Sequence, residues 1–179
     1  MSSMLLVKQA LLTVSNVVDF ETSVRAIYKE NRGLSEKYKA FEKNYKFAKY
    51  LRNKFVGHVK QELIKKSIEW KPELRYLLKD SDERNAIFAF NLFVLETAIN
   101  TYVNSDGSHQ FFDSETDLIY PPDMMRFLAF LSDTIRSAVD YLHDLEQVLG
   151  EKVKIPSLSA QGLEYWLAAG KTKFEFIKK

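Results

Sequence analysis

The chain has 179 residues and a net charge of +2, with 46% hydrophobic and 28% charged residues and no cysteine. This composition excludes a disordered chain, and the length suits one domain with a short appendage. The lack of cysteine excludes disulfides and thiolate metal sites and is typical of a cytoplasmic protein. Six glycines and four prolines leave few residues for tight turns, which favours long helices over an all-β fold.

Charge is distributed unevenly along the sequence. Residues 29–79 carry 15 Lys and Arg against 6 Asp and Glu, whereas residues 80–151 carry 3 against 14. This asymmetry suits a polyanionic partner such as RNA. It equally suits an arrangement in which the basic and acidic segments pair with each other, within the fold or across a dimer.

Neither a signal peptide nor a membrane span is expected. The N-terminus lacks a basic segment followed by an apolar run and a cleavage site. The most apolar run, residues 86–95, is about half as long as the roughly 18 residues that a membrane span needs. We therefore expect a buried helix there and no membrane partner.

Apolar residues spaced three and four apart predict four long helices. We expect them over residues 4–30, 35–70, 81–103 and 122–149, with one helical turn between 72 and 78. Gly33 suits a left-handed cap after the first helix, and Pro72 stops the second. The expected fold is therefore all-α, an up-and-down helical bundle of four long helices.

The C-terminal segment carries too many apolar residues for a free tail, among them Tyr165, Trp166, Phe174, Phe176 and Ile177. We expect a helical-bundle domain over residues 1–150. Residues 151–179 are expected to form an appendage, a short helix or tail that packs on the bundle or on a partner.

An arginine interrupts the apolar stripe of the second predicted helix. The stripe consists of Tyr38, Phe41, Tyr45, Ala48, Arg52, Phe55 and Val59. Arg52 thus occupies a position that the helical period assigns to an apolar residue. Gly57 weakens the helix just before His58, so we expect a kink or local irregularity there.

The spacing of Arg52 and His58 constrains any shared role. The two residues lie about 120° apart on a straight helix, at roughly 100° per residue. They can share one site only if the helix bends at Gly57, or if a two-fold dimer brings Arg52 of one chain beside His58 of the other. In a plainer alternative, Arg52 pairs with a buried acid and His58 caps a helix end.

The segment from Leu51 to His58 resembles the signature of the HEPN superfamily. That signature is an arginine, a polar residue that is often asparagine, and a histidine after four to six intervening residues. Here Arg52 and Asn53 are followed by four residues and His58. The resemblance implies an all-α domain. Active HEPN members are metal-independent endoribonucleases of toxin–antitoxin, abortive-infection and other phage-defence systems, whereas many others have lost catalysis.

The resemblance also implies roles for the motif residues. His58 would be the general acid/base, Arg52 the clamp on the phosphate and transition state, and Asn53 a positioning residue. It implies RNA as substrate, no metal or other cofactor, a homodimer with both motifs facing one cleft, and an antitoxin or other protein partner. In one subgroup a partner enzyme modifies a tyrosine two residues after the histidine. Lys60 stands there, so that pairing is not expected.

Other residues around the motif suit RNA binding. Lysines are expected to follow the phosphate backbone and tyrosines to stack on an unpaired base. The candidates are Lys46, Lys49, Lys54 and Lys60, with Tyr45 and Tyr50. Each lysine alone is more typical of a solvated helix face. The alternative function is a non-catalytic module that binds a protein or nucleic-acid partner through this basic helix and the aromatic tail.

A long loop after residue 103 contains His109 among acidic residues. Its acids are Asp106, Asp113, Glu115 and Asp117. Such a loop can hold a divalent ion, but oxygen-rich loops are commonly just solvated. We therefore predict no metal site.

Overall fold

The computed structural model describes residues 2–57, 59–80 and 82–153. These residues form seven α-helices and no strand, which confirms the all-α class, although four long helices were expected. In chain order the elements are α1 (Ser2–Val24), the 3-10 turn η1 (Arg25–Lys29), α2 (Arg32–Ala40), α3 (Glu42–Leu51), the π-helical turn η2 (Arg52–Val56), α4 (Gln61–Trp70), α5 (Leu74–Asp80), α6 (Glu83–Asn100) and α7 (Pro121–Gly150). None of these helices is both long and apolar enough to cross a membrane.

The chain divides into two compact units, Met1–Asp144 and Leu145–Lys179. The helices α1 to α6 and most of α7 belong to the first unit. The predicted division into residues 1–150 and 151–179 stays a prediction, because residues 154–179, including the aromatic residues of the expected appendage, lie outside the described residues.

The second predicted helix is divided into several elements. One helix was expected over residues 35–70, but Phe41, with φ −114° and ψ 11°, separates α2 from α3. A further break follows η2, and Lys60 has an extended backbone before α4. Gly33 does not cap the first helix, since it lies inside α2 and the break falls at Asn31.

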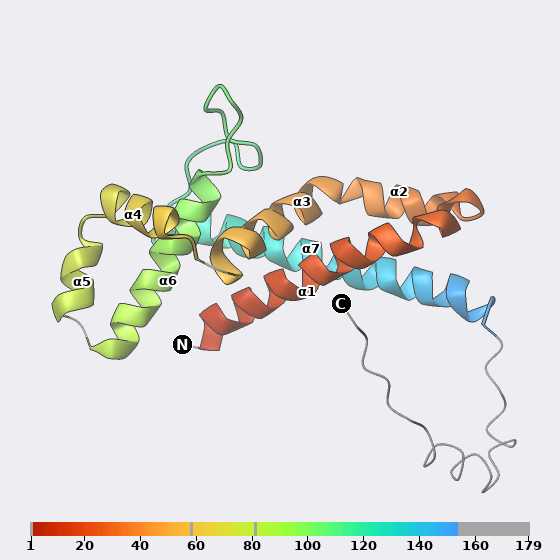
Figure 1. Cartoon of the computed structure of the whole chain (residues 1–179), viewed down its shortest axis with the longest axis horizontal. Helices are drawn as coiled ribbons and strands as arrows, with labels where there is room; N and C mark the ends of the chain where they lie inside the picture. The colour runs from red at the N-terminus through yellow and green to blue at the C-terminus, as the bar shows by residue number, and fades with distance from the viewer. Residues whose placement is uncertain (1, 58, 81, 154–179) are drawn as a thin grey trace, which may run out of the picture. The chain divides into compact units, whose positions relative to one another are not determined.

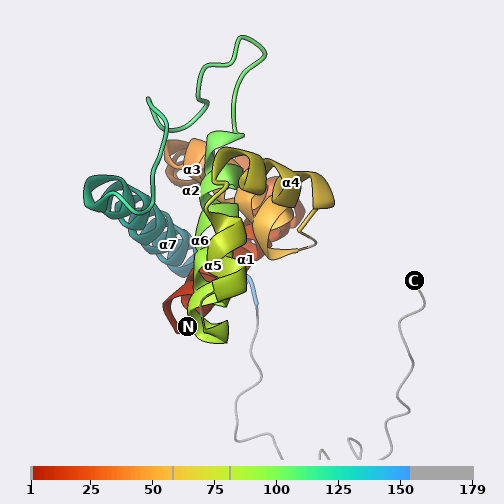
Figure 2. The same cartoon turned by 90° about the vertical axis from the view of Figure 1, so that its left-hand side faces the viewer.

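Within the first unit, α1 packs against α3 and η2 (Figures 1 and 2), and both α4 and α5 pack against α6. Aromatic rings fill the space between α3 and its neighbours. The Phe47 ring is surrounded by those of Tyr102, Phe111, Phe112 and Phe130, with centroids 4.4–5.7 Å away. These rings join α3, α7 and the loop between α6 and α7.

The buried face of α1 differs from the stripe that three- and four-residue spacing predicts there, namely Leu6, Ala10, Thr13, Val17, Phe20, Val24 and Ile27. Leu6 and Phe20 were placed on that stripe, but they are 68% and 45% exposed. The buried positions are Met4, Leu11, Val14, Ser15, Val17, Glu21 and Val24. Apolar residues occur on several sides of this helix, so the spacing alone allowed more than one register.

The carboxylate of Glu21 lies on that buried face. It is 3% exposed, pairs with Arg25 at 2.9 Å and accepts a hydrogen bond from the Tyr28 hydroxyl at 3.0 Å. The Tyr28 and Tyr141 hydroxyls lie 2.9 Å apart, which links α7 to this group. Burial, together with the Tyr141 hydroxyl and Glu21, raises the pKa of Tyr28.

The later helices are less completely buried than expected. In α6 the buried run is Leu92–Ile99, whereas Ile87 and Phe88 are 41% and 39% exposed. In α7, seven-residue spacing predicts an apolar seam of Leu128, Leu131, Ile135, Ala138, Leu142, Leu145 and Leu149. Leu131, Ala138 and Leu145 are buried, whereas Leu128, Ile135 and Leu142 are more than one-third exposed. The physical reason in α6 is that its first turns have the short helix α5 as their neighbour.

The Phe47 cluster allows a direct test of the core. Replacing Phe47 by alanine removes a fully buried ring from the centre of four others, and we expect the free energy of unfolding to fall by about 4 kcal/mol. Tyr76→Ala, at a side chain that is 70% exposed, serves as the control and should change stability by less than about 0.5 kcal/mol. Urea denaturation followed by circular dichroism measures both. Equal losses of stability in the two variants would contradict a core packed around Phe47.

Candidate functional site

The motif segment adopts an irregular backbone. Residues Arg52–Val56 form a π-helical turn, in which the Gly57 N–H donates to the Arg52 carbonyl at 2.9 Å. A π turn holds one more residue than an α turn and often marks a functional site. This confirms the irregularity that was predicted at Gly57. His58 lies outside the described residues, so its position relative to Arg52 stays a prediction.

The Arg52 guanidinium has no carboxylate partner among the described residues. Its Nη1 donates to Asn53 Oδ1 at 3.0 Å, and its Nε is buried without any hydrogen bond. Asn53 itself is exposed. A buried polar group without a partner is uncommon in a folded protein. The alternative in which Arg52 neutralises a buried acid therefore finds no support in the described part of the chain.

Two lysines lie beside the same turn. The Lys8 ammonium on α1 lies 4.7 Å from the centroid of the Phe55 ring, and burial lowers the pKa of Lys8. The Lys54 ammonium lies 5.7 Å from the centroid of the Tyr50 ring. Neither lysine pairs with a carboxylate of a described residue. We call Lys8, Arg52 and Lys54 the π-turn cations.

Among the other lysines that were predicted to contact RNA, two form ion pairs and one is exposed. Lys46 pairs with Glu42 at 2.9 Å and Lys49 with Asp19 at 2.5 Å, so both charges are already partly neutralised. Lys60 is exposed.

Tyr45 is fully buried, and its hydroxyl shares a 2.8 Å hydrogen bond with Ser137. Its predicted stacking on a base is therefore wrong, because the ring belongs to the core. The ring of Tyr50 is only half-buried, and its hydroxyl lies 3.1 Å from Thr101 Oγ1.

Sequence reasoning missed Lys8. It lies more than 40 positions from the motif, and only the packing of α1 against η2 brings it to the turn. One signal was available, since Lys8 is the first charged residue of the chain and interrupts an otherwise uncharged stretch that runs to Asp19.

The expectation that basic and acidic segments pair within the fold is met in part. Lys37 pairs with Asp144, and Lys71 lies 3.0 Å from Glu96 and 3.8 Å from Asp117. The π-turn cations take no part in such pairing among the described residues. The basic segment therefore contains both neutralised and available charges.

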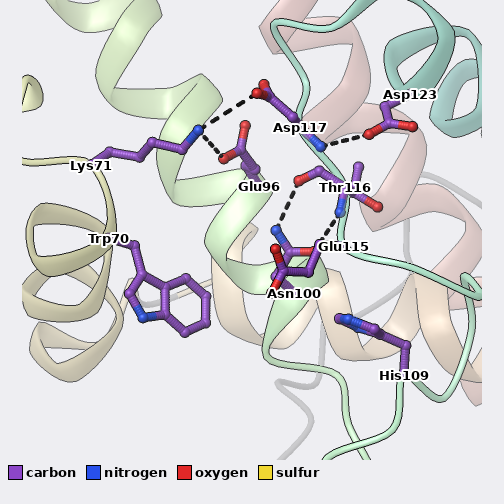
Figure 3. A pocket seen from close by; sticks show the side chains of 9 residues that line it. All are labelled: Trp70, Lys71, Glu96, Asn100, His109, Glu115, Thr116, Asp117 and Asp123. Carbon is purple, nitrogen blue, oxygen red and sulfur yellow. Dashed lines mark hydrogen bonds and ion pairs between the residues drawn. The ribbon is translucent and has the colours of Figure 1, made fainter.

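A second candidate site is a pocket of about 440 Å³ between the end of α4, α6 and the loop before α7. We call it the Trp70 pocket, and Figure 3 shows its walls. It is lined by Trp70, Lys71, Glu96, Asn100, His109, Glu115, Thr116, Asp117 and Asp123. Clefts of this size are typical of small-molecule sites.

Hydrogen bonds hold the loop wall of this pocket in place. The Asn100 amide accepts from the Thr116 N–H and donates to the Thr116 carbonyl, both at 2.8 Å. The Leu118 N–H donates to Glu96 at 2.9 Å, and the Asp117 N–H donates to Asp123 at 2.8 Å. The loop has no helix or named strand, so these bonds fix its path (Figure 3).

Burial governs the charges at the floor of the pocket. The Glu96 side chain is 5% exposed, and this burial raises the pKa of its carboxyl group, although the Leu118 N–H and Lys71 act in the opposite direction. Burial also disfavours the charge of Lys71, but the hydrogen bond and charge of Glu96 outweigh it, so the pKa of Lys71 is raised. Glu96 and Lys71 therefore form an ion pair, and the free-energy cost of burying each charge rises if the other partner is removed.

His109 shares its pocket with carboxylates, which are possible metal ligands. No three His, Asp or Glu side chains among them converge closely enough to hold a metal ion. His109, Glu115 and Asp117 do line one pocket, but they are spread over its walls.

Comparison with known proteins identifies no relative: no family model, no curated protein and no solved structure matches the chain.

The Lys71–Glu96 pair predicts a pH-dependent loss of stability. Lys71→Met leaves Glu96 buried without its cation, which raises the pKa of Glu96 further above its unfolded value of 4.5. The folded variant then holds a proton that the unfolded chain releases, so stability is lost as pH rises above that value. We expect a loss of about 2 kcal/mol at pH 8 and a smaller loss at pH 5.

Urea denaturation at the two pH values measures this effect. Lys66→Met is the matched control, because the Lys66–Glu69 pair is exposed and should contribute less than about 0.5 kcal/mol at either pH. A loss in Lys71→Met that is equal at pH 5 and pH 8 would show that Glu96 does not carry the effect.

Proposed function

We propose that the protein is a HEPN-type, metal-independent endoribonuclease that acts as a cytoplasmic homodimer in stress response or phage defence. In this proposal α1, α3, α6 and α7 are the long helices of an up-and-down bundle, and an antitoxin or other protein controls the enzyme. The observation that carries it is the Arg52 guanidinium, which lies on a π turn without a carboxylate partner among the described residues.

The electrostatics of the turn support a phosphate as the missing partner. Arginine offers a planar set of donors that fits phosphate oxygens, and the buried Nε of Arg52 has no acceptor among the described residues. Lys8 and Lys54 add two more positive charges at the same turn. A ribose-phosphate backbone supplies one negative charge at every nucleotide.

The reaction proposed is internal transesterification of RNA. The ribose 2′-oxygen attacks the adjacent phosphorus, and the bond from phosphorus to the 5′-oxygen breaks. The products are a 2′,3′-cyclic phosphate and a 5′-hydroxyl. His58 transfers the protons, one leaving the 2′-hydroxyl and one reaching the 5′-oxygen. Arg52 stabilises the added negative charge on the phosphate, and Asn53, which accepts its Nη1 hydrogen bond, orients it.

One set of observations favours the non-catalytic alternative. Lys46 and Lys49 are engaged in ion pairs and Tyr45 is buried, so part of the face expected to follow RNA is not free to do so. A module that binds a partner without cutting it needs only the π-turn cations and no proton transfer. Binding and cleavage therefore require separate measurements.

Cleavage is tested with a mixed RNA substrate in the presence of EDTA. We expect cleavage to persist with the chelator, to disappear in His58→Ala and to fall by about 10²- to 10³-fold in Arg52→Ala, because a transition-state donor is lost. Arg84→Ala is the matched control, since Arg84 is exposed at the start of α6 and forms no ion pair with a described residue. Full activity in both motif variants would overturn the proposal, and binding without cleavage by the wild type would favour the alternative.

Binding is tested through its salt dependence. If Lys8 contacts a phosphate, Lys8→Ala should reduce the slope of log K against log salt by about 0.7 for single-stranded RNA. Lys46→Ala should leave the slope nearly unchanged, because Glu42 already neutralises that lysine. Fluorescence anisotropy with a labelled RNA between 50 and 200 mM salt measures both slopes. An equal change of slope in Lys8→Ala and Lys46→Ala would contradict a phosphate contact that Lys8 makes and Lys46 does not.

A further inference from the structure

The helix α7 has an apolar side that faces away from the core. Its inward face is held to α3, since the Ser137 hydroxyl shares a 2.8 Å hydrogen bond with Tyr45 and the Thr134 hydroxyl accepts one from Asn44 at 3.2 Å. Five other apolar side chains of α7 are 36–65% exposed. We call them the α7 stripe, which consists of Met125, Leu128, Ile135, Val139 and Leu142.

The α7 stripe occupies one side of the helix. At about 100° per residue its five members fall within an arc of about 100°. The buried residues, among them Phe127, Thr134 and Ala138, are centred about 130° away from it. A helix at a protein surface normally presents polar residues to water. A continuous apolar stripe on that side is typical of a surface that contacts another molecule.

The spacing of the α7 stripe indicates that its partner is another helix. Together with the exposed Ser132, its members follow one another at alternating steps of three and four residues. This alternation is the a and d pattern of a coiled-coil seam, in which each side chain packs between residues of a facing helix. A small ligand would not need such a pattern over five turns of helix.

The α7 stripe is complementary to itself when two copies run antiparallel. A two-fold axis between positions 133 and 134 gives every member of the seam a facing residue in the second copy. The small Ser132 then faces the larger Ile135 in the layer nearest the axis. The three kinds of layer are Met125 with Leu142, Leu128 with Val139, and Ser132 with Ile135.

The charges beside the stripe are also complementary about this axis. Arg136 and Asp133 lie 3.9 Å apart within one chain, and their side chains are 73% and 58% exposed. In the antiparallel pair, Arg136 of one copy lies about 3 Å along the helix axis from Asp133 of the second copy. Parallel helices would instead bring the two arginines together and the two aspartates together. The charges therefore favour a second copy in the antiparallel orientation.

From these features we infer that two copies of this chain associate through the α7 stripe as an antiparallel helix pair. The stripe is about 26 Å long, and a contact of one helix from each chain is at the low end of stable interfaces. We therefore expect a dimer that dissociates on dilution through the micromolar range. The inference gives the proposed homodimer a surface, but it does not depend on whether the protein cleaves RNA.

Sedimentation of the full-length protein between about 1 and 100 μM measures the association. Val139→Glu should raise the dissociation constant of the dimer by more than about tenfold, because it places a charge in an apolar layer. Tyr76→Glu is the matched control, since it adds the same charge at a side chain that is 70% exposed on α5. It should change the constant by less than about twofold, and unchanged circular dichroism shows that both variants keep the fold.

Cross-linking tests the antiparallel orientation. The chain contains no cysteine, so Met125→Cys and Leu142→Cys each introduce a single thiol. A short bismaleimide should join two chains in a mixture of these variants but not in either variant alone, because identical positions lie about 26 Å apart along the pair. RNA cleavage is recorded on the same samples, so that a failure of association and a failure of the proposed function are told apart.

Several results would overturn the proposal. A dimer that Val139→Glu and Tyr76→Glu weaken equally would mean that a different face associates. Cross-linking of Met125→Cys with itself would mean a parallel pair. A monomer at about 100 μM whose Met125→Cys thiol resists alkylation would assign the stripe to residues 154–179 of the same chain. A monomer whose thiol reacts as fast as a free cysteine would leave the stripe to a different protein.

Discussion

The carboxylate of Glu96 is the point where three segments of the first compact unit meet. One oxygen pairs with Lys71 just after α4, and the other accepts the Leu118 N–H of the loop that leads to α7. A carboxylate that is only 5% exposed would cost several kcal/mol without such partners. The end of α4 and the loop must therefore both reach α6. The walls of the Trp70 pocket follow from this requirement.

Two kinds of positive charge occur in the basic segment, residues 29–79, and at Lys8 beside it. Lys37 and Lys71 lie against acids from residues 80–151 and help to hold the fold. The π-turn cations have no such partner among the described residues, and Arg52 even has a buried Nε without an acceptor. A buried donor without an acceptor is uncommon in a folded protein, so Arg52 differs from the lysines that hold the fold. This contrast, more than the net charge, is the observation that supports the proposed RNA partner.

The sequence predicted those features of the fold that depend on residues close together along the chain. The all-α class, the extent of α7 and the irregularity at Gly57 follow from helical spacing, from Pro121-Pro122 and from the conformational freedom of glycine. The sequence did not predict which face of α1 is buried, because apolar residues lie on several sides of this helix. The burial of Glu21 could not be predicted either, since its partner Tyr28 reaches it by folding back along η1, and Tyr28 in turn meets Tyr141 from α7.

For the candidate sites too, the sequence predicted only what neighbouring residues along the chain indicate. Arg52 was found because it breaks an apolar period, which is a local signal. Tyr45 was misassigned because the period cannot distinguish a ring that faces Ser137 in the core from one that faces solvent. The Trp70 pocket is assembled from three segments that are brought together by Glu96 and Asn100, so no single stretch of sequence indicated it.

The π turn also changes what the spacing of Arg52 and His58 implies. On a straight helix the two residues would face about 120° apart, which argues against one shared site. That separation assumes a regular helix from Arg52 onward, but the regular helix ends at Leu51. The π turn holds an extra residue between Arg52 and Gly57, so the residues beyond it no longer follow the phase of α3. The separation of about 120° expected for a straight helix therefore does not apply to this segment, and the position of His58 relative to Arg52 stays a prediction.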